Sequence, residues 1–258
     1  MDEFAAQPFA GRTALITGAG RGIGREIALQ LARAGAARLA LLARTRDQLV
    51  ETADLVARAG AEPLVVPVDL ADRADRSEKI VTVIAQWATI DILINNAGVA
   101  QPLGPTAGTA PVLLRRAVDV NLTAPIELAS ALLPAMVDQK WGRVVNVSSA
   151  AASDVRLLAG TNAYVTTKAG LEAHTLNLAF ELDGSGVTAN VYRPGHVDTS
   201  MNRQSYEEAK TTNPQMFEFM DRARREGALL TPAVSAAVLL AHLADRGNGQ
   251  IWHVDKTL

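Results

Sequence analysis

The sequence predicts an α/β fold in which a doubly wound parallel sheet of about seven strands carries helices on both faces, in a single domain spanning residues 1–258. Short apolar runs alternate with segments of helical periodicity along nearly the whole chain, as they do in repeated β-α units. The apolar runs are continuous, which is typical of strands covered by helices on both sides. The length fits one large domain, and no repeat or low-complexity linker divides it.

Strands are predicted where short apolar runs end at glycine-containing or polar turns. These runs are 13–17, 38–42, 63–68, 91–95, 144–147, 187–192 and 250–254. Helices are predicted where apolar residues recur three and four positions apart, and Gly35 and Gly60 end the first two. The helical segments are 23–34, 46–59, 72–88, 112–138, 164–182 and 232–244.

Two segments depart from this regularity. Pro125 and Pro134 lie inside 112–138, so we expect kinks or a break there. Residues 194–227 are expected to be irregular with short helices.

Composition excludes several classes of function. A net charge of -2 favours no nucleic-acid partner, and the lack of cysteine excludes disulfides and thiolate chemistry. The first residues are acidic where a signal peptide would be basic, and no apolar run approaches membrane-spanning length. We therefore expect a cytoplasmic protein that does not enter a membrane.

A glycine-rich turn follows the first predicted strand. Residues 17–24 read TGAGRGIG and open a helix, so the backbone can approach an anion closely at the helix N-terminus. Such a strand, turn and helix predict a dinucleotide site, although a turn of this kind also arises where only a tight bend is needed.

Two long connections follow predicted strand ends, at the edge of the sheet where α/β proteins hold ligands. These are residues 99–110 and 195–227, and we interpret the second as a substrate-covering lid. Met216, Phe217 and Met220 lie at helical spacing within it, as an apolar cover or as local core.

Tyr164 and Lys168 are four residues apart in a predicted helix and therefore share a face. A neighbouring ammonium group lowers the pKa of a phenol, which makes the phenol a usable acid or base. The pair taken alone is equally compatible with a solvated lysine beside a core tyrosine.

Several motifs stand in the order and spacing of the short-chain dehydrogenase/reductase family, which the chain resembles from residue 13 to about residue 255. They are TGAGRGIG at 17–24, Asp69, NNAG at 95–98, Asn121, Ser148-Ser149, Tyr164 with Lys168, and PGHVDT at 194–199. The resemblance implies a Rossmann fold and hydride transfer between a nicotinamide and a carbonyl or alcohol.

The resemblance also implies the roles of four catalytic residues. Tyr164 would be the general acid in reduction and the base in oxidation, and Ser149 would hydrogen-bond the same substrate oxygen. Lys168 would lower the tyrosine pKa and hold the nicotinamide ribose. Asn121 would anchor a water in the proton relay.

Cofactor contacts are implied at the matching positions. Asp69 would accept from the adenine amino group, Asn95 and Gly98 would shape the cleft, and Thr199 with the backbone of Val197 would hold the nicotinamide amide. The full set is Gly18, Gly20, Arg21, Gly22, Ile23, Gly24, Arg44, Asp69, Leu70, Asn95, Ala97, Gly98, Tyr164, Lys168, Pro194, Gly195, Val197 and Thr199.

The second predicted strand ends at Ala43, where relatives that use NAD place an acidic residue. Arg44 follows, and Arg21 lies within the glycine turn, so two guanidinium groups are available to one 2′-phosphate. We predict a preference for NADP(H).

The family places its catalytic serine thirteen residues before the tyrosine, but Ser149 precedes Tyr164 by fifteen. We interpret this as a two-residue insertion within 151–160, with Ser148 as the alternative serine. No metal site is expected, because His174, His196, His242 and His253 share no ligand spacing.

The sequence thus predicts an NADP(H)-dependent oxidoreductase acting on a ketone, aldehyde, 3-oxoacyl thioester, steroid-like alcohol or sugar. A non-catalytic NADP-binding sensor or scaffold is the alternative. Family members assemble through the helices that carry Asn121 and Tyr164, so the resemblance implies a homotetramer or dimer. The sequence contains no G-x-S-x-G motif, so it does not indicate a serine hydrolase.

Overall fold

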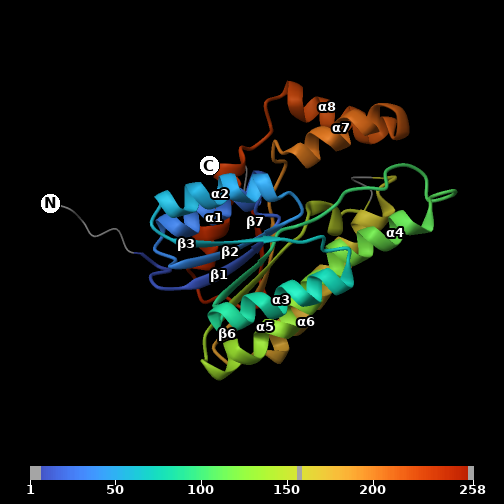
Figure 1. Cartoon of the computed structure of the whole chain (residues 1–258). Helices are drawn as coiled ribbons and strands as arrows, with labels where there is room; N and C mark the ends of the chain where they lie inside the picture. Colours follow the sequence, from blue (N-terminus) through green and yellow to red (C-terminus); the bar gives the residue numbers. More distant parts are fainter. Residues whose placement is uncertain (1–6, 156–158, 255–258) are drawn as a thin grey trace.

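The protein is built on one seven-stranded parallel sheet in the computed structural model, which describes residues 7–155 and 159–254. The strand order is β3-β2-β1-β4-β5-β6-β7, which confirms the predicted fold class (Figure 1). The strands are β1 (Thr13–Thr17), β2 (Arg38–Ala43), β3 (Glu62–Pro67), β4 (Ile92–Asn95), β5 (Gly142–Val147), β6 (Val187–Arg193) and β7 (Ile251–His253). The predicted strand ends lie within two residues of these bounds.

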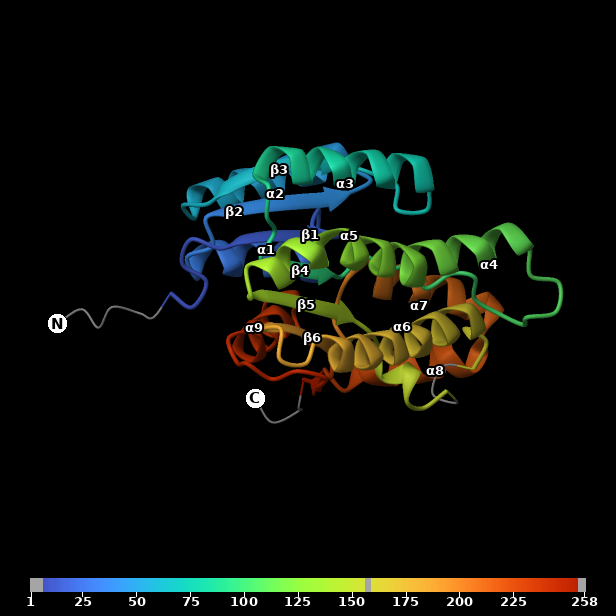
Figure 2. The same cartoon turned by 90° about the horizontal axis from the view of Figure 1, so that it is seen from below.

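Helices cover both faces of the sheet (Figures 1 and 2). They are α1 (Gly22–Arg33), α2 (Arg46–Arg58), α3 (Arg73–Trp87), α4 (Pro111–Val118), α5 (Ala124–Asp138), α6 (Asn162–Glu181), α7 (Ser200–Thr212), α8 (Pro214–Arg225) and α9 (Pro232–Leu243). Apolar side chains of α1, α2 and α9 pack into one core, and those of α3, α5 and α6 pack into the other. The continuous apolar strands separate the two cores.

The predicted helical segment 112–138 is interrupted next to Pro125, as expected, whereas Pro134 lies inside α5 without breaking it. A π-helical turn, Asp119–Thr123, joins α4 to α5, and Pro125 lies in the first turn of α5. By length and composition alone, Pro111–Asp138 could cross a membrane. Leu128 and Met136 are fully buried against the sheet, however, so packing in the core accounts for the apolar character of α5.

Residues 194–227 are more regular than expected. Helices α7 and α8 have 13 and 12 residues, and Figure 1 shows them standing out beyond the sheet. The Thr199 side chain caps α7 by accepting from the Asn202 N–H, and Asn213 caps α8 by accepting from the Met216 N–H. Asn213 followed by Pro214 is a recognisable helix start, which the sequence interpretation missed.

The strand order places a crevice between β1 and β4, where the direction in which successive strands are added reverses. The glycine turn follows β1 and the NNAG segment follows β4. Both therefore meet at the carboxyl edge of the sheet, where open α/β sheets bind ligands.

Candidate active site

The glycine turn is held against the NNAG segment by Asn96. Its Nδ2 donates to the carbonyl of Thr17 at 2.9 Å, and a Cβ added at Gly18 would lie 2.8 Å from the same nitrogen. A Cβ at Gly24 would lie 2.3 Å from the carbonyl oxygen of Gly18. Glycine is therefore required at both positions.

The first turn of α1 faces open space. Arg21, at its N-cap, makes no side-chain capping bond, and the turn holds no acidic residue. The first N–H groups of α1 have no partner within the helix, and the glycines leave room for an anion beside them. The turn therefore forms a cradle that fits the phosphates of a dinucleotide. The residues present thus match a nucleotide cofactor.

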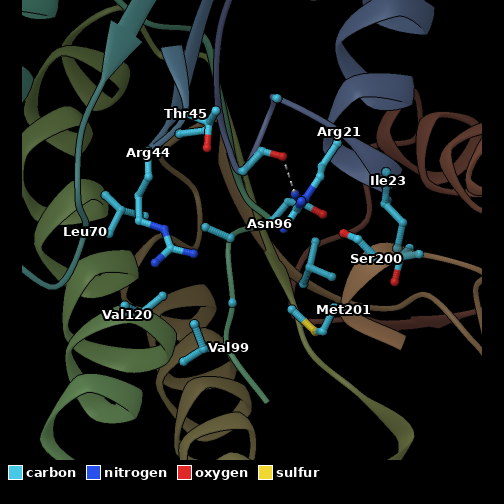
Figure 3. Close-up of a pocket in the computed structure, with 18 of the residues that line it drawn as sticks. Arg21, Ile23, Arg44, Thr45, Leu70, Asn96, Val99, Val120, Ser200 and Met201 are labelled. Atoms are coloured by element: carbon cyan, nitrogen blue, oxygen red, sulfur yellow. Dashed lines mark hydrogen bonds between the residues drawn. The ribbon is translucent and has the colours of Figure 1, made fainter. Parts of the chain in front are cut away.

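This turn lines one cleft together with Tyr164 and Lys168. Figure 3 shows the part of the cleft around Arg21, Arg44 and Met201. All of the predicted cofactor residues line it except Gly24, Asn95, Gly195 and Val197. Gly24 and Asn95 lie behind the lining, and Gly195 and Val197 line an adjoining cavity instead.

Asn121 does not line either space but is fully buried in the π turn. Its Oδ1 accepts from the Val99 N–H at 2.8 Å, and its Nδ2 donates to the Val99 carbonyl and to Thr167 Oγ1. Asn95 is similarly internal, and its Nδ2 donates to Asn146 Oδ1 at 2.8 Å. Asn121 thus holds the segment after β4 against the π turn and α6, and Asn95 joins the ends of β4 and β5.

Asp69 is engaged within the cleft. Its carboxylate accepts from Arg116 Nη2 at 3.0 and 3.3 Å and from the Ala71 N–H at 3.0 Å. Burial raises the pKa of Asp69, but the Ala71 N–H, the Arg116 guanidinium and the nearby Arg44 together lower that pKa below its ordinary value. The pairing of Arg116 with Asp69 could not be predicted from the sequence, because only the tertiary fold brings α4 close to the segment after β3.

The two arginines expected at the 2′-phosphate both line the cleft but approach it from different elements. Arg21 lies at the start of α1, whereas Figure 3 shows the Arg44 side chain directed toward Leu70. Ala43 also lines this region, together with Thr45 and Gln48, which the sequence interpretation had not singled out.

Tyr164 borders both spaces and is hydrogen-bonded to Ser149. Burial raises the pKa of Tyr164, contrary to the lowering expected from Lys168, while the bond with Ser149 opposes this rise. The Lys168 Nζ lies 5.9 Å from the centre of the tyrosine ring and donates to the Val147 carbonyl at 2.7 Å. Burial is therefore the largest influence on the pKa of this phenol.

Lys168 is itself strongly perturbed. Burial lowers the pKa of Lys168 to about 8, and the carboxylate of Glu172, one helical turn further along α6, opposes this fall. Glu172 forms a buried bidentate pair with Arg193, with N···O distances of 2.8 and 2.6 Å. This pair, unforeseen in the sequence, joins α6 to the end of β6 beside the lysine.

The two adjacent serines differ in position. Ser149 begins a 3-10 turn, Ala150–Ala152, accepts from the Ala151 N–H and lines the second cavity. Ser148 is 2% exposed and donates to the Lys168 carbonyl at 3.5 Å. The bond between Ser149 and Tyr164 favours Ser149 as the residue that meets a substrate oxygen.

We expect Ser149→Ala to lower kcat for carbonyl reduction by about 10²-fold or more, the usual effect of removing one donor to a developing oxyanion. Ser148→Ala should change kcat by much less. Steady-state kinetics of both variants decide between them, since loss of turnover in Ser148→Ala alone would show the assignment to be wrong.

The second cavity adjoins the first at Tyr164 and is covered by α7 and α8. Met216, Phe219 and Met220 line it, whereas Phe217 packs on Tyr206 with ring centres 5.1 Å apart. Phe219 therefore takes the place in the cavity lining that was expected for Phe217. The reason is that α8 begins at Pro214 and packs its other side, which carries Phe217, on α7.

Three loops meet around this cavity. The Gly104 N–H donates to the Gly160 carbonyl at 2.8 Å, and Asn162 Nδ2 donates to Thr106 Oγ1 at 3.1 Å. The Asn213 amide donates to the Ala159 carbonyl. The insertion expected within 151–160 thus borders both other loops, although its residues 156–158 lie outside those described.

Within residues 7–155 and 159–254, no group of three or more His, Cys, Asp or Glu side chains is arranged to hold a metal ion. Hydroxyl, ammonium and amide groups line the cleft, and its glycine turn fits a nucleotide. Fold and site together are those of a dinucleotide-binding protein.

Comparison with known proteins identifies the family. The family model for short chain dehydrogenases matches residues 12–210, and the chain belongs to this family of oxidoreductases. It is 34% identical over 194 residues to a short chain dehydrogenase from Pseudocercospora fijiensis, a match that covers 74% of this chain but 61% of that one. It is 30% identical over 252 residues to the 3-oxoacyl-(acyl-carrier-protein) reductase FabG of Staphylococcus epidermidis, covering 95% and 97% of the two chains.

Solved structures agree with this assignment. A metagenomic short-chain oxidoreductase in complex with NADP superimposes with a TM-score of 0.79 at 28% identity, covering 97% of this chain and 99% of that one. An NAD⁺-bound xylitol dehydrogenase superimposes with a TM-score of 0.82 at 25% identity, covering 95% and 98%. Proteins of this fold thus bind either dinucleotide.

Proposed function

We propose that this protein interconverts a carbonyl compound and a secondary alcohol with NADP(H), using Tyr164 as general acid and base. The observation that carries the proposal is that Tyr164 borders both the nucleotide-shaped cleft and the second cavity. A bound nicotinamide supplies or accepts hydride. The Tyr164 phenol would give a proton to the substrate oxygen in reduction and take one from the alcohol in oxidation.

Neighbouring residues support this chemistry. Ser149 would donate a second hydrogen bond to the substrate oxygen. Lys168 would hold the nicotinamide ribose and, when protonated, keep a positive charge near the phenol. Asn121 lies in the π turn, and we propose that it anchors a water through which the proton is returned to Tyr164. Thr199, which lines the cleft, and the backbone of Val197 are proposed to hold the nicotinamide amide.

A preference for NADP(H) is supported by Ala43, Arg44 and Arg21, all of which line the cleft. An acidic side chain at position 43 would repel a 2′-phosphate, and alanine does not. Asp69 is proposed to accept from the adenine amino group while it stays paired with Arg116.

The second cavity is proposed to bind the substrate, with residues 195–227 as its cover within a single domain of residues 1–258. Relatives of this family are named for 3-oxoacyl-(acyl-carrier-protein) and xylitol, so the family alone does not select a substrate. The methionine and phenylalanine lining of α8 supports a substrate with an apolar body.

The function is tested by following NADPH oxidation spectroscopically with a panel of ketones, aldehydes and 3-oxoacyl thioesters. Turnover of at least one class, lost in Tyr164→Phe, is the expected result. Tight binding of NADPH without turnover of any class would instead favour a sensor or scaffold.

A fall in activity at alkaline pH is expected from Lys168. The lysine is charged below its pKa of about 8 and neutral above it, whereas burial keeps the proton on Tyr164. We expect kcat/KM for reduction to decrease as the pH rises through about 8, measured from about pH 6 to about pH 10. Lys168→Arg stays charged over this range, so an unchanged alkaline limb in that variant would contradict the assignment.

We also propose a cytoplasmic homo-oligomer, a tetramer or dimer built on the helices that carry Asn121 and Tyr164. Exposed apolar side chains support it: Val112 is 60% exposed on α4, and Phe180 is 82% exposed on α6. A monomeric mass in light scattering would contradict it.

A further inference from the structure

Arg224 presents an unpaired guanidinium N–H group at the wall of the second cavity. Its Nη1 is buried and has no hydrogen-bond partner among the described residues, whereas its Nη2 donates to Asn202 Oδ1 at 2.7 Å. A buried donor without a partner is costly to the folded protein. Arg224 lines the cavity, so a change of its side-chain torsion angles would let Nη1 donate to an acceptor on a bound molecule.

The guanidinium is held in place by its neighbours and is not neutralised by them. It lies 4.1 Å from the centre of the Tyr206 ring, and the Tyr206 hydroxyl donates to Asp221. Asp221 in turn pairs with Arg225 at 2.9 Å. In the described part of the chain, no carboxylate lies within ion-pair distance of Arg224, so its positive charge is available to the cavity.

The rest of the cavity lining is apolar or neutral. Met216, Phe219 and Met220 cover one side, and Ala150 and Ala151 lie on another. Among the described residues that line the cavity, Arg224 is the one with a permanent charge. An apolar cavity with one fixed cation is complementary to an apolar molecule that carries one anionic group.

We infer that Arg224 binds a carboxylate of the substrate, so that this enzyme acts on oxo acids or hydroxy acids with an apolar body. This inference rests on the proposed function and names its substrate class. A carboxylate carries a single charge, which one guanidinium matches with charge-assisted hydrogen bonds. A phosphate carries about -1.5 to -2 and would leave uncompensated charge against the methionines.

The inferred substrate is held at two points. Its carbonyl oxygen meets Ser149 and Tyr164, and its carboxylate meets Arg224, which α8 contributes to the lining of the same cavity. Recognition at the second point would orient the carbonyl for hydride transfer and select against neutral analogues. The separation of the two groups in the substrate is set by the cavity, so a series of chain lengths is needed to find it.

The test compares oxo acids of increasing chain length, ending with benzoylpropionate, each paired with its methyl ester. Steady-state kinetics with NADPH give kcat/KM, and calorimetric titration of the protein with each compound gives binding without turnover. The variants are Arg224→Met, which removes the charge, and Arg224→Lys, which keeps it. Arg222→Met is the matched control, because Arg222 is exposed on the same helix and does not line the cavity.

For at least one chain length, we expect the wild type to prefer the acid over its ester by about tenfold or more. Arg224→Met should lose about tenfold more on the acid than on the ester, Arg224→Lys should lose less, and Arg222→Met should keep the preference. Equal kcat/KM and equal affinity for acid and ester in the wild type, or a preference that survives in Arg224→Met, would overturn the inference. A phosphate-bearing analogue that binds better than every acid would overturn it as well.

The two proposals fail in different ways. If no compound is reduced but calorimetry shows an acid preference that depends on Arg224, the proposed reaction is wrong and the carboxylate site stands. If acids and esters are reduced equally, the reaction stands and the carboxylate site does not. Melting temperatures of all variants establish that each one is folded.

Discussion

Tyr164→Phe is expected to reduce kcat for carbonyl reduction by about 10²–10⁴-fold, the usual contribution of a positioned acid. The substitution removes one oxygen atom and leaves the ring that borders both spaces. Affinity for NADPH should therefore change little, because the cradle at α1 and the contacts of Arg21 and Arg44 are untouched. Rapid-mixing absorbance measurements give kcat, and fluorescence titration gives the cofactor affinity.

A matched control is available in Tyr192, which lines neither space and whose buried hydroxyl donates to the Ser235 carbonyl at 2.5 Å. Tyr192→Phe removes the same atom from the core and should lower the melting temperature while leaving kcat of the folded enzyme intact. A Tyr164→Phe enzyme with kcat close to that of the wild type would exclude the phenol as the proton donor.

Cofactor selection gives the second large effect. Replacing both Arg21 and Arg44 with alanine is expected to lower kcat/KM for NADPH by about 10²-fold and to alter kcat/KM for NADH far less. Each charge-assisted bond contributes about 1.5–3 kcal/mol, with the low end appropriate to exposed side chains. Since about 1.4 kcal/mol is a factor of ten, each single variant should lose about tenfold.

Arg46→Ala is the control for this experiment, because Arg46 is exposed at the start of α2 and does not line the cleft. Its effect on both cofactors should be small. The position of Arg44, directed toward Leu70 in Figure 3, adds a distinction between the two arginines. If Arg44 contacts the adenine more than the 2′-phosphate, Arg44→Ala will weaken NADH and NADPH alike. Equal kcat/KM for the two cofactors in the wild type would contradict the predicted preference.

The fold and much of the site were predictable because their signals are local. Continuous apolar strands, glycines after β1 and helical spacing between Tyr164 and Lys168 are each set by neighbouring residues. The motif order predicted that Tyr164 and Lys168 lie at the carboxyl edge of the sheet, and in the structure both line one cleft with the glycine turn.

What the sequence did not predict depends on contacts between distant segments. Asp69 and Arg116 are brought together only when the fold sets α4 against the segment that follows β3, and Glu172 meets Arg193 only across α6 and β6. The lining role of Phe219 in place of Phe217 depends on where α8 begins. The raised pKa of Tyr164 likewise follows from burial, which no spacing in the sequence reveals.

The amide of Asn213 connects parts of the molecule that a protein engineer would otherwise treat separately. It caps α8 with its oxygen and holds the Ala159 carbonyl with its nitrogen, and a Cβ at Gly160 would lie 2.6 Å from that nitrogen. Grafting α7 and α8 from a relative onto this chain would therefore leave the 151–160 loop without its anchor. New substrate ranges will have to be built by exchanging both segments as a unit.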